Sequence, residues 1–181
     1  MRRPRCSELI AILLAVLPAA GPAFGATAQK PGKFSGVPNT TIRGEGRALE
    51  GDLLSVAGTT VRLMGIDAPD AGQLCKNRYG HELDCFTIAR DVLAGLIQGQ
   101  EVECTVADQD RNRQKQGECR VRGIDLGGAM VARGWAFQYW GLTSAYQTAE
   151  SYAQSKRMGL WAGRVEKPWE WRSRRLREQA R

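Results

Sequence analysis

The stretch that decides the fold reads Glu50-Gly-Asp-Leu-Leu-Ser-Val56 and, after a short turn, Thr60-Val-Arg-Leu-Met-Gly-Ile-Asp-Ala-Pro-Asp70. Both halves are rich in apolar and β-branched residues, which favours strands over Asp52–Val56 and Thr60–Ile66. Ala57-Gly58-Thr59 between them has the composition of a hairpin turn. A further strand is predicted just before this hairpin, over Thr41–Leu49. Residues 41–66 are therefore predicted to form three consecutive strands.

Downstream of these strands, apolar residues recur at helical spacing, and the pattern ends at Gly99 as a helix C-terminus would. The repeating positions are Phe86, Ala89, Val92, Leu93, Leu96 and Ile97. Two strands around Cys104 and Cys119 are predicted next, then helices over Asp125–Ala132 and Thr148–Met158. This element order predicts a mainly β, α+β fold: a five-stranded barrel with about three packed helices.

The N-terminus reads as a secretory signal. Arginines within the first five residues precede an apolar run, Leu9–Leu17, and then a segment of small residues and proline. We expect residues 1–25 to be the signal peptide, with cleavage between about residues 25 and 28. The apolar run is shorter than the roughly 20 residues of a membrane span, so no stable membrane anchor is expected. The mature chain is predicted to be exported, to a periplasm or to the medium.

The remainder is predicted to be one domain. Residues 26–38 form a Pro- and Gly-rich linker, residues 39–172 the barrel domain, and residues 173–181 a basic tail. About 150 residues are enough to bury one hydrophobic core, and we expect a monomer. The formal net charge of the chain is +7. The basic tail is either a site for phosphate or an anionic surface, or a solvated end.

The mature chain keeps four cysteines, Cys75, Cys85, Cys104 and Cys119, an even number that suits an oxidising compartment. Four cysteines allow three pairings. The segments around Cys104 and Cys119 alternate like neighbouring strands, which favours a disulfide between these two and leaves Cys75 and Cys85 to close a short loop. A zinc site is the rival interpretation. It is disfavoured because no Cys-x-x-Cys pair occurs and His81 is the only histidine.

The residue types present also exclude several hydrolase mechanisms. One histidine excludes paired-histidine phosphodiesterase chemistry, and neither a Gly-x-Ser-x-Gly elbow nor a phosphate loop ending in Gly-Lys-Ser/Thr is present. His81 is interpreted as a solvated loop residue. Carboxylate and guanidinium chemistry remains.

Carboxylates and an arginine come together across the predicted hairpin. Asp52 at the start of one strand and Asp67 at the end of the next can hold an oxygen-loving cation. Arg62 lies between them, where a guanidinium could neutralise charge developing on a phosphodiester. Asp70, just past the Pro69 turn, could orient or deprotonate an attacking water.

These stretches resemble the thermonuclease family, also called staphylococcal-nuclease-like, over essentially the whole mature chain. The matching marks are Gly51-Asp52, the segments Val61–Asp70 and Leu126–Ala136, and Met158-Gly-Leu-Trp-Ala-Gly163. The resemblance implies an OB-fold barrel that hydrolyses DNA and RNA phosphodiester bonds with Ca²⁺. By resemblance, Asp52, Asp67 and the main-chain oxygen of Ala68 match the calcium ligands, and Arg62 matches one of two phosphate-binding arginines.

Two departures from the family put its activity in question here. The family has glutamate at Asp70, and the shorter side chain withdraws the carboxylate by roughly 1.5 Å, a displacement large enough to cost about a hundredfold in rate. The second arginine of the family corresponds to Gln114, and its stacking tyrosine to Asn112. Loss of such a donor typically costs about 10²- to 10³-fold. Arg111 and Arg113 are the possible phosphate-binding substitutes; the alternative is that both are solvated turn arginines.

Two hypotheses follow. The chain is either a weak calcium-dependent nuclease acting on DNA or RNA, or a non-catalytic OB-fold module that binds nucleic acid, another polyanion or a protein partner. The retention of Asp52, Arg62 and Asp67 favours the enzyme. Four aromatic residues after the short helix either stack on bases or pack in the core: Trp135, Phe137, Tyr139 and Trp140.

Overall fold

The computed structural model describes residues 40–109, 114–139 and 145–181, with the side chains of residues 107–109 not described. The predicted signal peptide and linker lie outside this range, as do Arg111, Asn112, Arg113 and Trp140. The helices are α1 (Cys85–Ile97), α2 (Leu126–Ala132), α3 (Gln147–Ser155) and α4 (Pro168–Gln179), with a 3₁₀ turn over Gly159–Ala162. The part of the chain that the structure describes contains no helix long and apolar enough to cross a bilayer.

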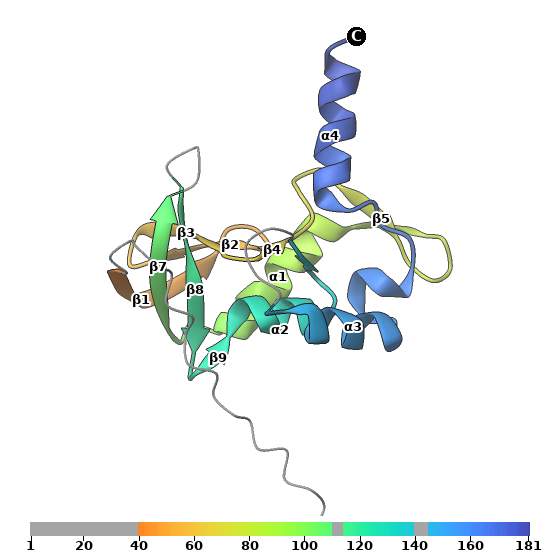
Figure 1. Ribbon diagram of the computed structural model, residues 1–181. Coiled ribbons are helices and arrows are strands. Elements are labelled where there is room, and N and C mark those ends of the chain that lie inside the picture. The colour runs from red at the N-terminus through yellow and green to blue at the C-terminus, as the bar shows by residue number, and fades with distance from the viewer. Residues whose placement is uncertain (1–39, 110–113, 140–144) are drawn as a thin grey trace, which may run out of the picture. The chain divides into compact units, whose positions relative to one another are not determined.

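Five strands close into the predicted barrel. They are β1 (Thr40–Ala48), β2 (Leu53–Val56), β3 (Thr59–Leu63), β7 (Glu101–Gln109) and β8 (Lys115–Val121). The sheet order is β3-β2-β1-β7-β8, extended by β9 (Ile124–Asp125), and the parallel pairing of β3 with β8 closes the ring (Figure 1). Closure of the ring removes exposed sheet edges. The strand order and the closing pair confirm the predicted α+β fold with a five-stranded barrel.

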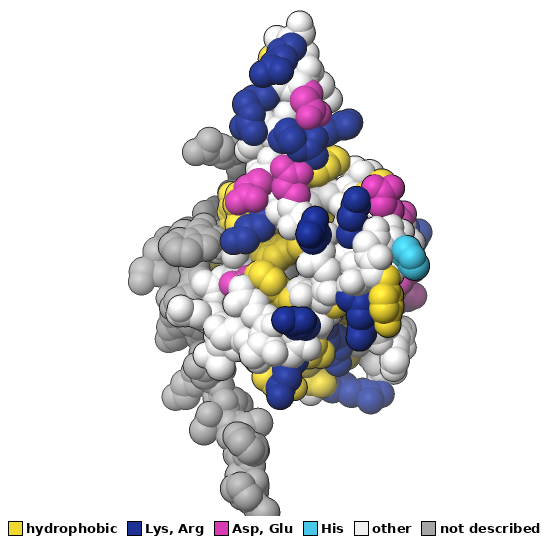
Figure 2. Space-filling view, turned by 90° about the vertical axis from the view of Figure 1, so that its right-hand side faces the viewer, with side chains coloured by type: hydrophobic (Ala, Val, Ile, Leu, Met, Phe, Trp, Pro, Cys, Tyr) yellow, Lys and Arg dark blue, Asp and Glu magenta, His cyan; other side chains and the backbone are white. Residues whose placement is uncertain are grey.

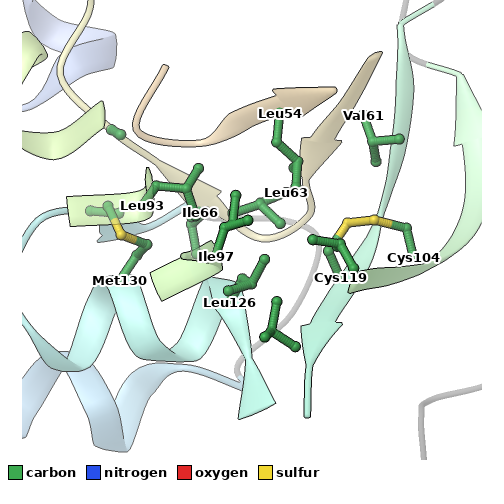
Figure 3. Close-up of a cluster of buried hydrophobic side chains, with 14 of the residues drawn as sticks. Leu54, Val61, Leu63, Ile66, Leu93, Ile97, Cys104, Cys119, Leu126 and Met130 are labelled. Atoms are coloured by element: carbon green, nitrogen blue, oxygen red, sulfur yellow. A yellow bond between two sulfur atoms is a disulfide. The ribbon is translucent and has the colours of Figure 1, made fainter. Parts of the chain in front are cut away.

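The core lies between the barrel and the first two helices. Leu54, Val61 and Leu63 from the barrel meet α1 and α2 in one buried cluster, to which the helices contribute Leu93, Ile97, Leu126 and Met130 (Figure 3). Each fully buried aliphatic side chain contributes about 1.5–3 kcal/mol. Cys104 and Cys119 face each other on β7 and β8 and form one disulfide, and Cys75 pairs with Cys85, as predicted.

The predicted third strand is shorter than expected. It ends at Leu63, and a turn at Met64 and Gly65 follows, with Gly65 at φ 77°. The chain then enters β4 (Ile66–Asp67), which pairs with β10 (Phe137–Gln138) instead of continuing in the barrel. Asp67 therefore lies on a separate two-stranded ladder beside the barrel rim.

The helix ends follow local chemistry. Asp84 caps α1 by accepting from the Thr87 amide, and Asp125 caps α2 through the amides of Gly127 and Gly128. The helix predicted to reach Met158 ends at Ser155, because Arg157 takes a left-handed conformation at φ 50°.

The helix α4 occupies most of the predicted basic tail. It begins with a proline at its first position, where the missing amide costs nothing. Two short strands, β5 (Leu74–Lys76) and β6 (Glu82–Asp84), pair before α1. A second buried cluster supports the start of α4 through Trp169, which packs against it together with Trp161. The buried members of this cluster are Cys75, Cys85, Phe137 and Leu160. Figure 2 shows Lys and Arg side chains gathered on α4, interleaved with Asp and Glu.

Candidate active site

A pocket of about 370 Å³ opens where the β2–β3 hairpin, β4 and α4 meet. The sequence-predicted residues Asp52, Arg62, Asp67 and Asp70 all line it, so the structure brings them together. The other lining residues are Leu63, Gly65, Ile66, Gln114, Gln116, Tyr139 and Arg172. His81 lies in an exposed turn and is absent from this lining.

The hairpin pair consists of Arg62 with its two carboxylate partners, Asp52 and Glu50. Arg62 Nη1 donates to Asp52 Oδ1 at 2.6 Å, and Nη2 donates to Glu50 Oε2 at 3.1 Å. Strand pairing sets this geometry, because Arg62 on β3 lies opposite Leu53, the residue that follows Asp52. Asp52 is 3% exposed. Burial raises the pKa of Asp52 to about 7; the charge of Arg62 opposes this shift, and Asp67 and Glu50 add to it.

Gly51 lets Asp52 reach the β4 turn. A Cβ at Gly51 would lie 2.7 Å from the Ala68 Cβ and 2.8 Å from the Ala89 Cβ, so a larger residue would push the hairpin away. The Ala68 amide lies 3.4 Å from Asp52 Oδ2. Asp52 and the buried Asp67 are thereby held on adjacent backbones at the pocket.

The helix pair consists of Arg172 with Asp67 and Asp70, and residue patterns did not predict it. Arg172 Nη1 and Nη2 donate to the two oxygens of Asp67 at 3.0 and 2.6 Å, and Nη1 also donates to Asp70 Oδ2 at 2.8 Å. Hydrogen bonds to Asp67 raise the pKa of Arg172 above its ordinary value, so it stays charged. Burial raises the pKa of Asp70, and Arg172 opposes this without cancelling it.

A buried glutamine fixes the backbone that carries Arg172. Gln73 is fully buried; its Nε2 donates to the Glu166 carbonyl at 2.6 Å, and its Oε1 accepts from the Asp70 amide at 3.1 Å. One side chain thus ties the Asp70 turn to the segment entering α4. Trp169, three residues before Arg172, packs against Phe137 and Tyr139 with ring centroids 6.0 and 5.5 Å away.

The structure decides between core packing and base stacking for two of the four predicted aromatic residues. Phe137 is buried in the second cluster and Trp135 packs against the core, so these two are structural. Tyr139 is 38% exposed and lines the pocket. Gln114, which the resemblance aligns with the family's second arginine, also lines the pocket.

The donor set suits a hard cation. Asp52 and Asp67 are buried carboxylates on adjacent backbones, and Ala68 lies beside them. Within residues 40–109, 114–139 and 145–181, no three His, Cys, Asp or Glu side chains converge to form a metal site by themselves. A cation here would need main-chain oxygens and water, ligands that Ca²⁺ accepts. The described cysteines are all in disulfides, so a zinc site does not fit.

Comparison with known proteins identifies the family. The profile described as "Staphylococcal nuclease homologue" matches residues 60–163. The chain belongs to the staphylococcal nuclease family. It is 34% identical over 115 residues to "Staphylococcal-like nuclease CAN1" of Arabidopsis thaliana, covering 62% of this chain and 32% of that relative.

For two bacterial relatives, the aligned region covers a larger share of the relative's length. The chain is 32% identical over 144 residues to "Micrococcal nuclease" of Shigella flexneri, covering 70% of this chain and 77% of the relative. It is 28% identical over 128 residues to "Succinoglycan biosynthesis protein ExoI" of Rhizobium meliloti, covering 69% and 67%. By contrast, the chain spans about a third of the length of the plant relative.

Proposed function

We propose that this protein is a calcium-dependent phosphodiesterase that hydrolyses DNA or RNA. The observation that carries the proposal is the convergence of Asp52, Arg62, Asp67 and Asp70 on one pocket of a staphylococcal nuclease barrel. Relatives named as nucleases support the same reaction class. The predicted signal and the two disulfides suit an exported enzyme.

Each of these residues has its own role in the proposed reaction. Asp52, Asp67 and the Ala68 main-chain oxygen would hold the cation, which when bound polarises a phosphoryl oxygen and neutralises developing charge. Arg62 donates two hydrogen bonds from a fixed strand position and can present the same guanidinium to a phosphate. Asp70 orients or deprotonates the attacking water. Tyr139 offers a ring face to a base beside the reacting phosphate.

We expect a modest rate from the same pocket. Gln114 is neutral and cannot stabilise the developing charge as a guanidinium does. Asp70 has a shorter reach than glutamate and is engaged by Arg172. A non-catalytic module that binds nucleic acid through the same pocket is the competing function, and it is distinguished by whether bound nucleic acid is cut.

The test is cleavage of labelled single-stranded and double-stranded oligonucleotides by the disulfide-intact mature protein, across a range of free Ca²⁺. We expect cleavage that requires Ca²⁺ and is lost in Asp52→Ala. Arg43→Gln is the control, because Arg43 lies on β1, pairs with Glu101 and Glu103, and does not line the pocket. Binding of Ca²⁺ and oligonucleotide without cleavage would support the non-catalytic module instead. Absence of Ca²⁺ binding would rule out the calcium enzyme.

A further inference from the structure

Among the residues that the structure describes, two guanidiniums line the pocket, and each is held by different carboxylates. Arg62 is held by Asp52 and Glu50, and Arg172 by Asp67 and Asp70. The two arginines come from β3 and α4. A phosphodiester entering this pocket would therefore meet one guanidinium from the barrel and one from the C-terminal helix.

The charges of these two pairs do not balance. With all four carboxylates ionised, as cation binding requires, four negative and two positive charges leave two negative charges within this group. One divalent cation would compensate both, and it would bind Asp67, the residue that Arg172 holds in a bidentate manner. A cation on Asp67 would compete with Arg172 and leave its guanidinium available to an anion.

We propose that Arg172 is the second phosphate-binding arginine of this site, paired with Asp67 and Asp70 until a divalent cation and a phosphodiester bind. The inference rests on the proposed function and assigns to α4 the role that Gln114 cannot fill. The guanidinium is a planar fork that matches two phosphate oxygens as it matches Asp67.

The surroundings of Arg172 suit such an exchange. Its side chain is 41% exposed, while its backbone is fixed through Gln73 and the Trp169 packing. The guanidinium can change partners without moving the helix. Arg172 and Gln114 line the same pocket, so a phosphate bound there could be reached from either position.

Neighbouring arginines on α4 provide matched controls. Arg174 is held by Glu166 and Glu178, and Arg175 stacks over the Trp171 ring at 5.4 Å. Neither lines the pocket. Arg175→Gln therefore removes the same charge from the same helix without touching the site.

The first experiment measures binding by calorimetry, without catalysis. Ca²⁺ is titrated into wild type, Arg172→Gln, Arg172→Lys and Arg175→Gln, and then a nucleoside monophosphate is titrated into each Ca²⁺-loaded protein. We expect Arg172→Gln to bind Ca²⁺ at least as tightly as Arg175→Gln does, because the competing cation is gone. Its monophosphate affinity should fall about tenfold, the loss of one charge-assisted hydrogen bond. Equal monophosphate affinity in Arg172→Gln and Arg175→Gln would overturn the inference, as would loss of Ca²⁺ binding in Arg172→Gln.

The second experiment measures kcat and KM for oligonucleotide cleavage. Arg172→Gln should lower kcat about a hundredfold and raise KM by up to about tenfold, and Arg172→Lys should recover only part of kcat. Gln114→Arg should restore activity to Arg172→Gln, because it returns a guanidinium to the same pocket. If Arg111→Gln or Arg113→Gln lowers kcat while Arg172→Gln does not, the inference is wrong and the nuclease assignment stands. If wild type neither binds Ca²⁺ nor cuts, the proposed function and this inference both fall.

Discussion

The hairpin pair and the helix pair use the same chemistry but are built differently. Arg62 reaches Asp52 across ten residues of chain, within one strand pairing, and Asp52 is nearly enclosed. Arg172 reaches Asp67 across 105 residues and depends on Gln73 and aromatic packing for its position. Local strand pairing fixes the position of Arg62, whereas the position of Arg172 depends on how α4 packs and can change when one packing contact is lost. The hairpin pair is therefore suited to hold the site together, and the helix pair to exchange partners.

Removal of Arg62 should have the largest effect on activity. Arg62→Gln takes away a guanidinium that the account assigns to the phosphate, and it leaves the buried Asp52 with no cationic partner in the hairpin pair. We expect kcat for oligonucleotide cleavage to fall about 10²- to 10³-fold. Arg43→Gln, which also changes an arginine on a barrel strand, should retain wild-type kcat. An Arg62→Gln enzyme with unchanged kcat would contradict the role given to the hairpin pair.

Removal of Gln73 should weaken the helix pair without touching the hairpin pair. Gln73→Ala leaves the Glu166 carbonyl without its donor and unties α4 from the Asp70 turn. We expect kcat to fall about tenfold and the free energy of unfolding to fall by about 1–3 kcal/mol. Gln100→Ala is the control, because Gln100 makes only exposed contacts. If Gln73→Ala lost stability but kept full kcat, the position of Arg172 would not matter to the reaction.

The last prediction concerns stability rather than activity, and it isolates Asp52 of the hairpin pair through its pH dependence. Burial raises the pKa of Asp52 from 3.8 to about 7 in the folded protein. A raised folded-state pKa stabilises the protein fully below about pH 4, and this contribution is lost as the pH rises to about 7. In EDTA, the free energy of unfolding measured by urea titration should therefore fall between pH 4 and 7, by at most about 4 kcal/mol for this residue. Asp52→Asn should show a smaller fall, and identical slopes for both proteins would refute the shift.

The same comparison explains what the sequence could reveal. Alternating strands, the helical spacing of Leu93 and Ile97, and the Asp125 cap are local signals, and the elements built on them were predicted. The convergence of Asp52 and Arg62 was predicted from the pairing of two adjacent strands, whereas the contact of Glu50 with Arg62 was not predicted. The break at Gly65 was missed because the apolar pattern continues through it.

The helix pair was missed for a physical reason. Pro168 and Glu170 are local signals for a helix start, but the arginine-rich run after them is equally typical of a solvated end. Residue spacing does not reveal which arginine would meet Asp67, because that contact depends on how α4 packs through Trp169 and Gln73.

The most direct test of the account is a crystal structure of the mature protein with Ca²⁺ and a nucleoside monophosphate. The account predicts that Asp52 and Asp67 ligate the ion, that Arg172 has left Asp67, and that Arg62 and Arg172 both donate to the phosphate. A structure with the phosphate bound and Arg172 still bidentate on Asp67 would contradict it.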